Sequence, residues 1–244
     1  MRNLRLRLMY DGTSYHGWQV QPNGITVQEE LQNAIEKILG TRENVVGCSR
    51  TDAGVHANDF CCNMKTEHEI DCYRLTGALN AVLPEDISVK SVEEADADFH
   101  ARYSCVSKQY VYRMWNANYK NPFLVNRAWH YKNKINAPFL NEQAQAFVGT
   151  HDFKAFCSAG SSVEDTVRTV KSFTVERQGD EVLFTVEADG FLYNMVRIMV
   201  GTLIEISENK IEKDKISAII CCKDRLLAGK TAPPQGLYLN RVSY

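Results

Sequence analysis

The sequence lacks the cysteine spacings that mark common metal and redox sites. Eight cysteines occur among its 244 residues, but no two follow the C-x-x-C pattern that is typical of zinc sites and thioredoxin-like motifs. Two pairs are adjacent, Cys61-Cys62 and Cys221-Cys222, and secreted disulfide frameworks rarely use adjacent cysteines. The sequence therefore predicts reduced, mostly buried thiols in a cytosolic protein.

Long apolar segments and nucleotide-binding motifs are missing as well. No run of about 18 uncharged apolar residues could form a membrane-spanning helix, and the N-terminus has no apolar leader segment. No G-x-G-x-x-G occurs, and Gly229-Lys230-Thr231 is not a phosphate loop because Asp224 stands where that loop needs its first glycine. We expect a soluble cytoplasmic protein with no membrane segment and no nucleotide cofactor.

Acidic residues are absent from one long segment of the chain. The formal net charge is -2, but residues 99–141 contain seven Lys or Arg and no Asp or Glu, so this segment is +7 and the rest is -9. The segment also holds ten of the 24 aromatic residues. Basic and aromatic side chains together suit a nucleic-acid surface. Core strands with solvated basic edges would have the same composition, so both interpretations stay open.

Hydrophobic periodicity predicts a chain in which strands and helices are mixed. Residues 4–10 alternate as a strand does. Thr26 to Glu29 form a capping box, and apolar residues follow at helical spacing until Gly40, which predicts a helix over 27–39. The remaining pattern predicts two α+β halves that meet near residue 105. Further strands are expected at 45–49, 60–64, 87–92, 109–116, 168–177 and 182–188, and helices at 72–82, 140–148, 191–207 and 213–221.

Two places carry polar residues that call for an explanation. The loop from Arg50 to His56 combines an arginine, the carboxylate of Asp52 and an imidazole, as a catalytic loop does, although an ordinary turn with a capping Asp fits the pattern too. Arg197 is the single charge in the apolar stretch 191–204. Its guanidinium must reach water or meet a carboxylate, because an unpaired buried charge is costly.

The chain resembles the tRNA pseudouridine synthase A family, which is named for modifying positions 38 to 40 of tRNA. Several motifs carry the resemblance, and they occur in the order of the family along nearly the whole chain. They are Tyr10 to Thr13, Tyr15 to Gln19, Gln21 to Asn23, Thr26 to Gln28, Arg50 to Ala57, Phe99 to Arg102, Tyr110 to Tyr112, Gly149 to Phe153, Phe191 to Gly201 and Gly236 to Leu239.

The resemblance implies a fold and an assembly. The expected fold is α+β, with two similar halves whose antiparallel sheets are flanked by helices and an active-site cleft between the halves. Residues 1–104 would carry the catalytic Asp loop, and residues 105–244 would complete the cleft and the dimer and tRNA surface. The expected partners are the anticodon stem-loop of tRNA and a second copy of the chain.

The resemblance also implies an activity and the residues that perform it. The activity is isomerisation of uridine to pseudouridine after the base is flipped out, with no cofactor and no metal. Asp52 would be the nucleophile, and Arg197 would form an ion pair with it. Tyr110 would stack on the uracil as a candidate base, and Arg50 and Leu237 would bind the substrate.

Two other functions compete with this interpretation. A noncatalytic RNA-binding module would use the basic, aromatic segment 99–141. A metal-dependent hydrolase would use Asp52 and His56 together with Cys61, Cys62 or His100, although these residues lack the helical spacing and closed ligand set of known metal sites. Neither alternative explains why so many motifs occur in the order of one family.

Overall fold

The computed structural model describes residues 1–160 and 163–244, which fall into two compact units. The first unit contains Met1–Val106 and Tyr238–Tyr244, and the second contains Ser107–Leu237. The chain therefore passes from the first unit to the second after residue 106, where the sequence predicts a boundary after residue 104. It returns to the first unit for its last seven residues, 238–244.

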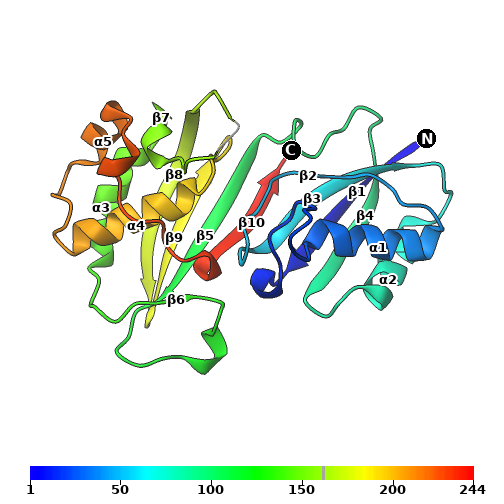
Figure 1. Ribbon diagram of the computed structural model, residues 1–244, viewed down its shortest axis with the longest axis horizontal. Coiled ribbons are helices and arrows are strands. Elements are labelled where there is room, and N and C mark those ends of the chain that lie inside the picture. The colour runs from blue at the N-terminus through cyan, green and yellow to red at the C-terminus, as the bar shows by residue number, and fades with distance from the viewer. Residues whose placement is uncertain (161–162) are drawn as a thin grey trace. The chain divides into compact units, whose positions relative to one another are not determined.

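The first unit is a sheet with two helices (Figure 1). Strands β4, β1 and β3 are neighbours in that order and antiparallel, and β2 pairs with β3. The last strand, β10, joins β3 in parallel, with Tyr238 opposite His56. The elements are β1 (Arg2–Tyr10), α1 (Val27–Leu39), β2 (Val45–Gly47), β3 (His56–Thr66), α2 (Cys72–Val82), β4 (Ile87–Ala95) and β10 (Leu237–Ser243).

Alternation along β1 divides its side chains between two faces. Leu4, Leu6 and Leu8 are fully buried in the core of the unit, and burial of a leucine is worth about 1.5–3 kcal/mol. Helix α1 begins where the Thr26 hydroxyl accepts the N–H of Glu29 and ends at Gly40 in the left-handed conformation. The capping box and the glycine stop therefore mark the ends of this helix as the sequence predicts.

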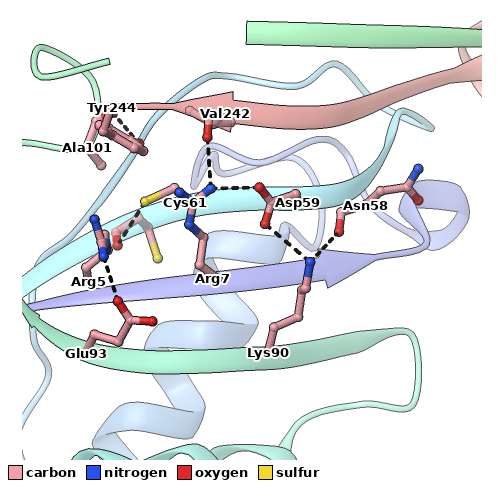
Figure 2. A network of polar contacts seen from close by, with 11 residues as sticks. Arg5, Arg7, Asn58, Asp59, Cys61, Lys90, Glu93, Ala101, Val242 and Tyr244 are labelled. Carbon is pink, nitrogen blue, oxygen red and sulfur yellow. Dashed lines mark hydrogen bonds and ion pairs between the residues drawn. The ribbon is translucent and has the colours of Figure 1, made fainter. Parts of the chain in front are cut away.

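The opposite face of β1 carries polar side chains (Figure 2). Arg5 pairs with Glu93 at 2.6 Å, and Arg7 pairs with Asp59 at 2.7 Å. Nearby, the buried amide of Asn63 donates to Asn3 and accepts the backbone N–H of Ala101, both at 2.9 Å. These contacts attach the segment after β4 to the sheet.

Among its described residues, the second unit combines a sheet with three helices. Strands β5, β9, β8 and β7 are antiparallel neighbours in that order, and β6 pairs with β5 in parallel. Helix α3 packs on β8 and on α4. The elements are β5 (Ser107–Trp115), β6 (Trp129–His130), α3 (Ala137–Ala144), β7 (Gly149–Asp152), β8 (Val167–Gln178), β9 (Glu181–Ala188), α4 (Met195–Ser207) and α5 (Ile216–Cys222).

These elements confirm the predicted α+β class and correct its details. The sheets are mixed, because β10 and β6 pair in parallel. Helix α4 begins at Met195 and not at residue 191, because Asn194 has a φ of 62° and a left-handed residue cannot continue a helix. Helix α3 ends at Ala144, and a 3-10 turn over Gln145–Phe147 follows it. Strands β6, β7 and β10 are not predicted from the sequence.

The eight cysteines are free thiols, as expected, but the prediction that most are buried is wrong. Cys48, Cys61 and Cys62 are buried, whereas Cys221 and Cys222 are exposed and the other three are intermediate. The exposed pair lies at the end of α5, a helix of seven residues in which Ile216, Ile219 and Ile220 are the buried side chains. Within the described ranges, no helix has the length and apolar character needed to cross a membrane.

We predict that Asn63→Ala lowers the free energy of unfolding by about 2–3 kcal/mol, because it removes two buried hydrogen bonds and leaves the N–H of Ala101 without its acceptor. The control is Asn58→Ala, since the amide of Asn58 is exposed and bonds Asn240 at the surface. Urea unfolding followed by circular dichroism measures both. Equal losses for the two variants would contradict the role assigned to Asn63.

Candidate active site

Asp52 lies in the loop that connects β2 to β3. The side chain of Asp52 is half-buried and that of Arg50 is exposed. The loop closes as a turn in which the N–H of Val55 donates to the carbonyl of Asp52 at 3.1 Å, with Gly54 at a φ of 75°. A carboxylate and a guanidinium therefore lie two residues apart on a loop whose backbone is folded on itself.

The segment after β1 holds this loop from its outer side. The N–H of Trp18 donates to the carbonyl of Thr51 at 3.1 Å, and the N–H of Gly54 donates to the carbonyl of Tyr15 at 3.2 Å. The buried hydroxyls of Tyr10 and Thr51 are 2.9 Å apart and share a hydrogen bond. These three bonds clamp the backbone on both sides of Asp52, and we call them the Thr51 clamp.

The clamp requires glycine at a point of close backbone approach. Gly17 has a φ of +86°, and a Cβ at this position would lie 2.4 Å from the carbonyl oxygen of Thr51 and 3.1 Å from the carbonyl carbon of Asp52. Both the left-handed conformation and the missing side chain are therefore necessary. Glycine at position 17 therefore allows the backbone of the segment after β1 to contact the backbone of the Asp52 loop.

His56 braces the same loop from its C-terminal end. Its ring is only 2% exposed, its Nδ1 lies 3.0 Å from the backbone nitrogen of Gly12 and 3.1 Å from the carboxylate of Asp11, and it stacks on Tyr238 at 4.5 Å. These contacts hold the imidazole inside the unit. Among the described residues, no group of three or more His, Cys, Asp or Glu side chains is arranged to hold a metal ion.

In the second unit, Arg197 is held by oxygen atoms of its own surroundings. Its Nε donates to the carbonyl of Ala232 at 2.7 Å, and its Nη1 donates to the side chain of Asn194 at 2.6 Å. Asn194 in turn donates to the hydroxyl of Ser158 at 2.9 Å. The guanidinium is half-buried and its plane is fixed, so it does not extend freely into water as a snorkelling arginine would.

Tyr110 and Leu237 both belong to the second unit. Tyr110 is buried on β5, with its ring edge-on to Phe191 at 5.1 Å. Tyr112 follows on the same face of the strand; its hydroxyl donates to the carbonyl of Pro233 at 2.8 Å, and Gly236 lies against its ring. Leu237 comes next in the chain. The segment 232–237 thus runs from Arg197 to the face of β5 that carries Tyr110.

Burial raises the pKa of Tyr112 well above its ordinary value, and the positive charge of Arg197 opposes that rise. Both the phenol of Tyr112 and the guanidinium of Arg197 belong to the second unit. The structure therefore gathers Arg197, Tyr110 and Leu237 in the second unit, and Arg50 and Asp52 in the first. The pairing of Asp52 with Arg197 stays a prediction.

Sequence reasoning missed the residues that hold the predicted ones in place. Tyr10 and Thr51 share one bond of the clamp, Gly17 permits the close approach of the two backbones, and Asn194 both starts α4 and bonds Arg197. An asparagine just before an apolar helical run was the available signal for Asn194, because asparagine tolerates the left-handed conformation. No sequence signal connects Tyr10 with Thr51, which is 41 residues away.

The aromatic residues of the acid-free segment 99–141 divide between core and surface. The segment is therefore consistent both with core strands and with a nucleic-acid surface. The buried ones belong to the core of the second unit, and the exposed ones lie in loops among basic residues. Tyr110, Tyr112 and Tyr131 are buried, whereas Tyr103, Tyr119 and Phe123 are exposed.

Comparisons with known proteins identify the family of the chain. The family model described as tRNA pseudouridine synthase matches residues 8–104 and 143–244. The tRNA pseudouridine synthases A of Thermoanaerobacter sp. (strain X514), Acetivibrio thermocellus and Clostridium acetobutylicum are 47%, 46% and 43% identical over 244 residues, with 100% of both chains covered. A solved chain from a Cbf5-Nop10-Gar1 complex aligns at a TM-score of 0.40 and 14% identity, covering 98% of this chain and 58% of that one, which is too weak to support an inference.

The first unit carries a carboxylate on a clamped loop, and the second unit carries an oriented arginine and a buried tyrosine. Because the family match covers most of the sequence, the chain belongs to the tRNA pseudouridine synthase family. Members of this family are isomerases that convert uridine to pseudouridine in tRNA. The resemblance noted in the sequence is confirmed.

We predict that Gly17→Ala lowers kcat by at least about tenfold, because a Cβ there pushes the backbone of Thr51 and Asp52 by a distance that catalytic geometry does not tolerate. Gly40→Ala is the matched control. Gly40 has a similar φ of +76° but nothing within 4 Å of its added Cβ, so we expect about 1 kcal/mol of lost stability and an unchanged kcat. Pseudouridine formation in tRNA, measured beside thermal unfolding, tests both variants. Equal loss of kcat in both would contradict the clamp.

Proposed function

We propose that the protein isomerises uridine to pseudouridine at positions 38, 39 and 40 of the tRNA anticodon stem-loop, with Asp52 as the nucleophile. The observation that carries this proposal is the Thr51 clamp, which fixes the backbone of one carboxylate-bearing loop from both sides. Family membership supports the reaction and the tRNA substrate. The resemblance of the Arg50 to Ala57 motif supports the choice of Asp52.

The reaction needs a carboxylate and no external reagent. The bond between N1 of the base and C1′ of the ribose breaks, a bond between C5 and C1′ forms, C5 loses its proton and N1 gains one. No atom is oxidised or reduced overall, so the stoichiometry requires no cofactor. Asp52 acts either by adding to the uracil ring or by assisting cleavage of the glycosidic bond.

Arg197 would keep Asp52 ionised. A guanidinium next to a carboxylate favours the charged form, which is the nucleophilic one. The hydrogen bonds of Arg197 to Ala232 and Asn194 support this role, because they fix the orientation of the planar guanidinium. The fixed fork is what bidentate carboxylate recognition requires.

The other predicted residues would bind the flipped nucleotide. Flipping a base out of a stem costs a few kcal/mol, which contacts in the pocket must offset. Tyr110 would stack on the uracil and is the candidate to take the C5 proton, Leu237 would pack against the ring, and Arg50 would occupy the space that the base leaves. The exposure of Arg50 on the loop of Asp52 supports its contact with RNA.

The resemblance supports two further parts of the proposal. The protein would act as a homodimer in the cytoplasm, where its tRNA substrate is found. The exposed aromatic residues Tyr119 and Phe123, together with the exposed Lys120 and Arg127, support a tRNA surface in the loop after β5.

We predict that Asp52→Asn lowers kcat by more than about a thousandfold while tRNA binding stays within a few-fold, because the amide cannot act as a nucleophile. Release of tritium from tRNA labelled at C5 of uridine, in EDTA, measures the chemistry. Asp98→Asn is the control, because its carboxylate is exposed. A wild type that binds tRNA and releases no tritium would favour the noncatalytic RNA-binding module. Tritium release that EDTA abolishes would contradict a reaction without a metal.

Replacement of Arg197 by Met should lower kcat by roughly 10- to 100-fold with little change in tRNA affinity, because a hydrogen-bonded charge pair is worth about 1.5–3 kcal/mol. Arg225→Met is the control, since Arg225 also donates to backbone carbonyls of the second unit, at Ala228 and Gly229. Steady-state kinetics and a filter-binding assay separate the two effects. Equal losses of affinity and kcat in Arg197→Met would exclude the pairing role.

A further inference from the structure

A short loop of the first unit presents an aromatic side chain to solvent without an evident role in folding. Tyr103 is 77% exposed, and its ring stacks on the imidazole of His100, with centroids 4.3 Å apart and an interplanar angle of 29°. The guanidinium carbon of Arg102 lies 5.7 Å from the centroid of the tyrosine ring. We call residues 100–104 the Tyr103 loop.

Hydrogen bonds within the Tyr103 loop fix its shape. The Nδ1 of His100 accepts the backbone N–H groups of Arg102 and Tyr103, each at 3.2 Å. The N–H of Ser104 donates to the carbonyl of His100 at 2.9 Å, and the N–H of His100 donates to the hydroxyl of Ser104 at 3.1 Å. Because Nδ1 accepts, the imidazole in this form carries its proton on Nε2.

The loop is also attached firmly to the sheet behind it. The N–H of Ala101 donates to Asn63 at 2.9 Å, and the hydroxyl of Tyr244 donates to the carbonyl of Ala101 at 2.8 Å, as Figure 2 shows for the second contact. Phe99, just before the loop, packs on Tyr244 at 5.0 Å and under the guanidinium of Arg5 at 5.7 Å. The exposed Tyr103 therefore stands on a fixed base.

We propose that the Tyr103 loop is a stacking platform for an unpaired nucleotide of the tRNA, separate from the residues assigned to the chemistry; the proposal rests on the proposed function. Bases stack on exposed aromatic rings, and the gain is independent of sequence because every base has a flat face. Arg102 would contact the phosphate of the same nucleotide. An aromatic ring that is ordered before binding loses little entropy when the base arrives.

Arginines pair with two of the acidic residues next to the loop, which reduces the repulsion of RNA phosphates there. The acidic run 93–98 precedes it, but Glu93 pairs with Arg5 at 2.6 Å and Glu94 accepts the Nε of Arg2 at 2.7 Å. The acid-free segment 99–141 begins at the loop itself. Asp96 and Asp98 remain exposed, so the proposal assigns most of the binding to stacking, which is less sensitive to charge than phosphate contacts are.

The test compares Tyr103→Ala with Tyr103→Phe, which keeps the ring, and with Tyr73→Ala, which removes an 87% exposed tyrosine from helix α2 of the same unit. Filter binding of unmodified tRNA gives Kd, and pseudouridine formation gives kcat and KM. We expect Tyr103→Ala to raise Kd and KM by about 5- to 100-fold with kcat unchanged. We expect Tyr103→Phe and Tyr73→Ala to behave as the wild type.

Three results would overturn the platform. An unchanged Kd in Tyr103→Ala would remove it and leave the proposed function standing. An equal loss in Tyr73→Ala would show a general surface effect. A change of oligomeric state in Tyr103→Ala without tRNA, measured by sedimentation, would assign the loop to a protein interface. Failure of the proposed function is distinguishable, because the wild type would then form no pseudouridine whatever the Kd of the variants.

Discussion

The contact between the backbone of Thr51 and the segment after β1 is the constraint on which the site depends. Two backbone hydrogen bonds and one hydroxyl pair hold the loop of Asp52, and Gly17 allows the two backbones to touch. Connecting segments are otherwise more mobile than the strands they join. The clamp gives the carboxylate a defined position before substrate arrives.

The clamp is itself part of the core. Trp18, which donates to Thr51, is buried and stacks on Phe60 of β3 at 4.0 Å. Phe60 also contacts the ring of Tyr10, the donor or acceptor of the hydroxyl pair. The same aromatic side chains that stabilise the first unit therefore position the loop of Asp52, so we expect a substitution in this cluster to change both stability and activity.

Local patterns in the sequence predicted the bounds of helices that begin and end at recognisable capping residues. Thr26 and Gly40 bound α1, and the helix expected at 72–82 is α2. The predicted start of α4 was wrong, because the apolar pattern continues through Asn194 and hides this asparagine as the start of the helix. Strand β10 was missed because its pairing with β3 joins residues about 180 positions apart, and such pairings leave no local pattern.

The candidate site, too, was predictable from the sequence only in part. Periodicity and composition alone left Asp52 as an ordinary turn residue and Arg197 as a snorkelling one, and the ordered motifs of one family changed both interpretations. The family is confirmed by the match over most of the chain, while the roles of the individual residues stay predictions. The clamp, the bonds of Arg197 and the fixed Tyr103 loop depend on tertiary contacts, and no pattern in the sequence encodes them in a readable way.

The most direct measurement is a structure of the protein with tRNA that carries 5-fluorouridine at positions 38 to 40. The reaction requires C5 to lose a proton, and a C5 that carries fluorine has none to lose, so we expect the reaction to stop on the enzyme. The account predicts a flipped nucleotide from the anticodon stem-loop with the Asp52 carboxylate in contact with its base or its C1′. A nucleotide bound in the stopped complex with Asp52 remote from both atoms would contradict it.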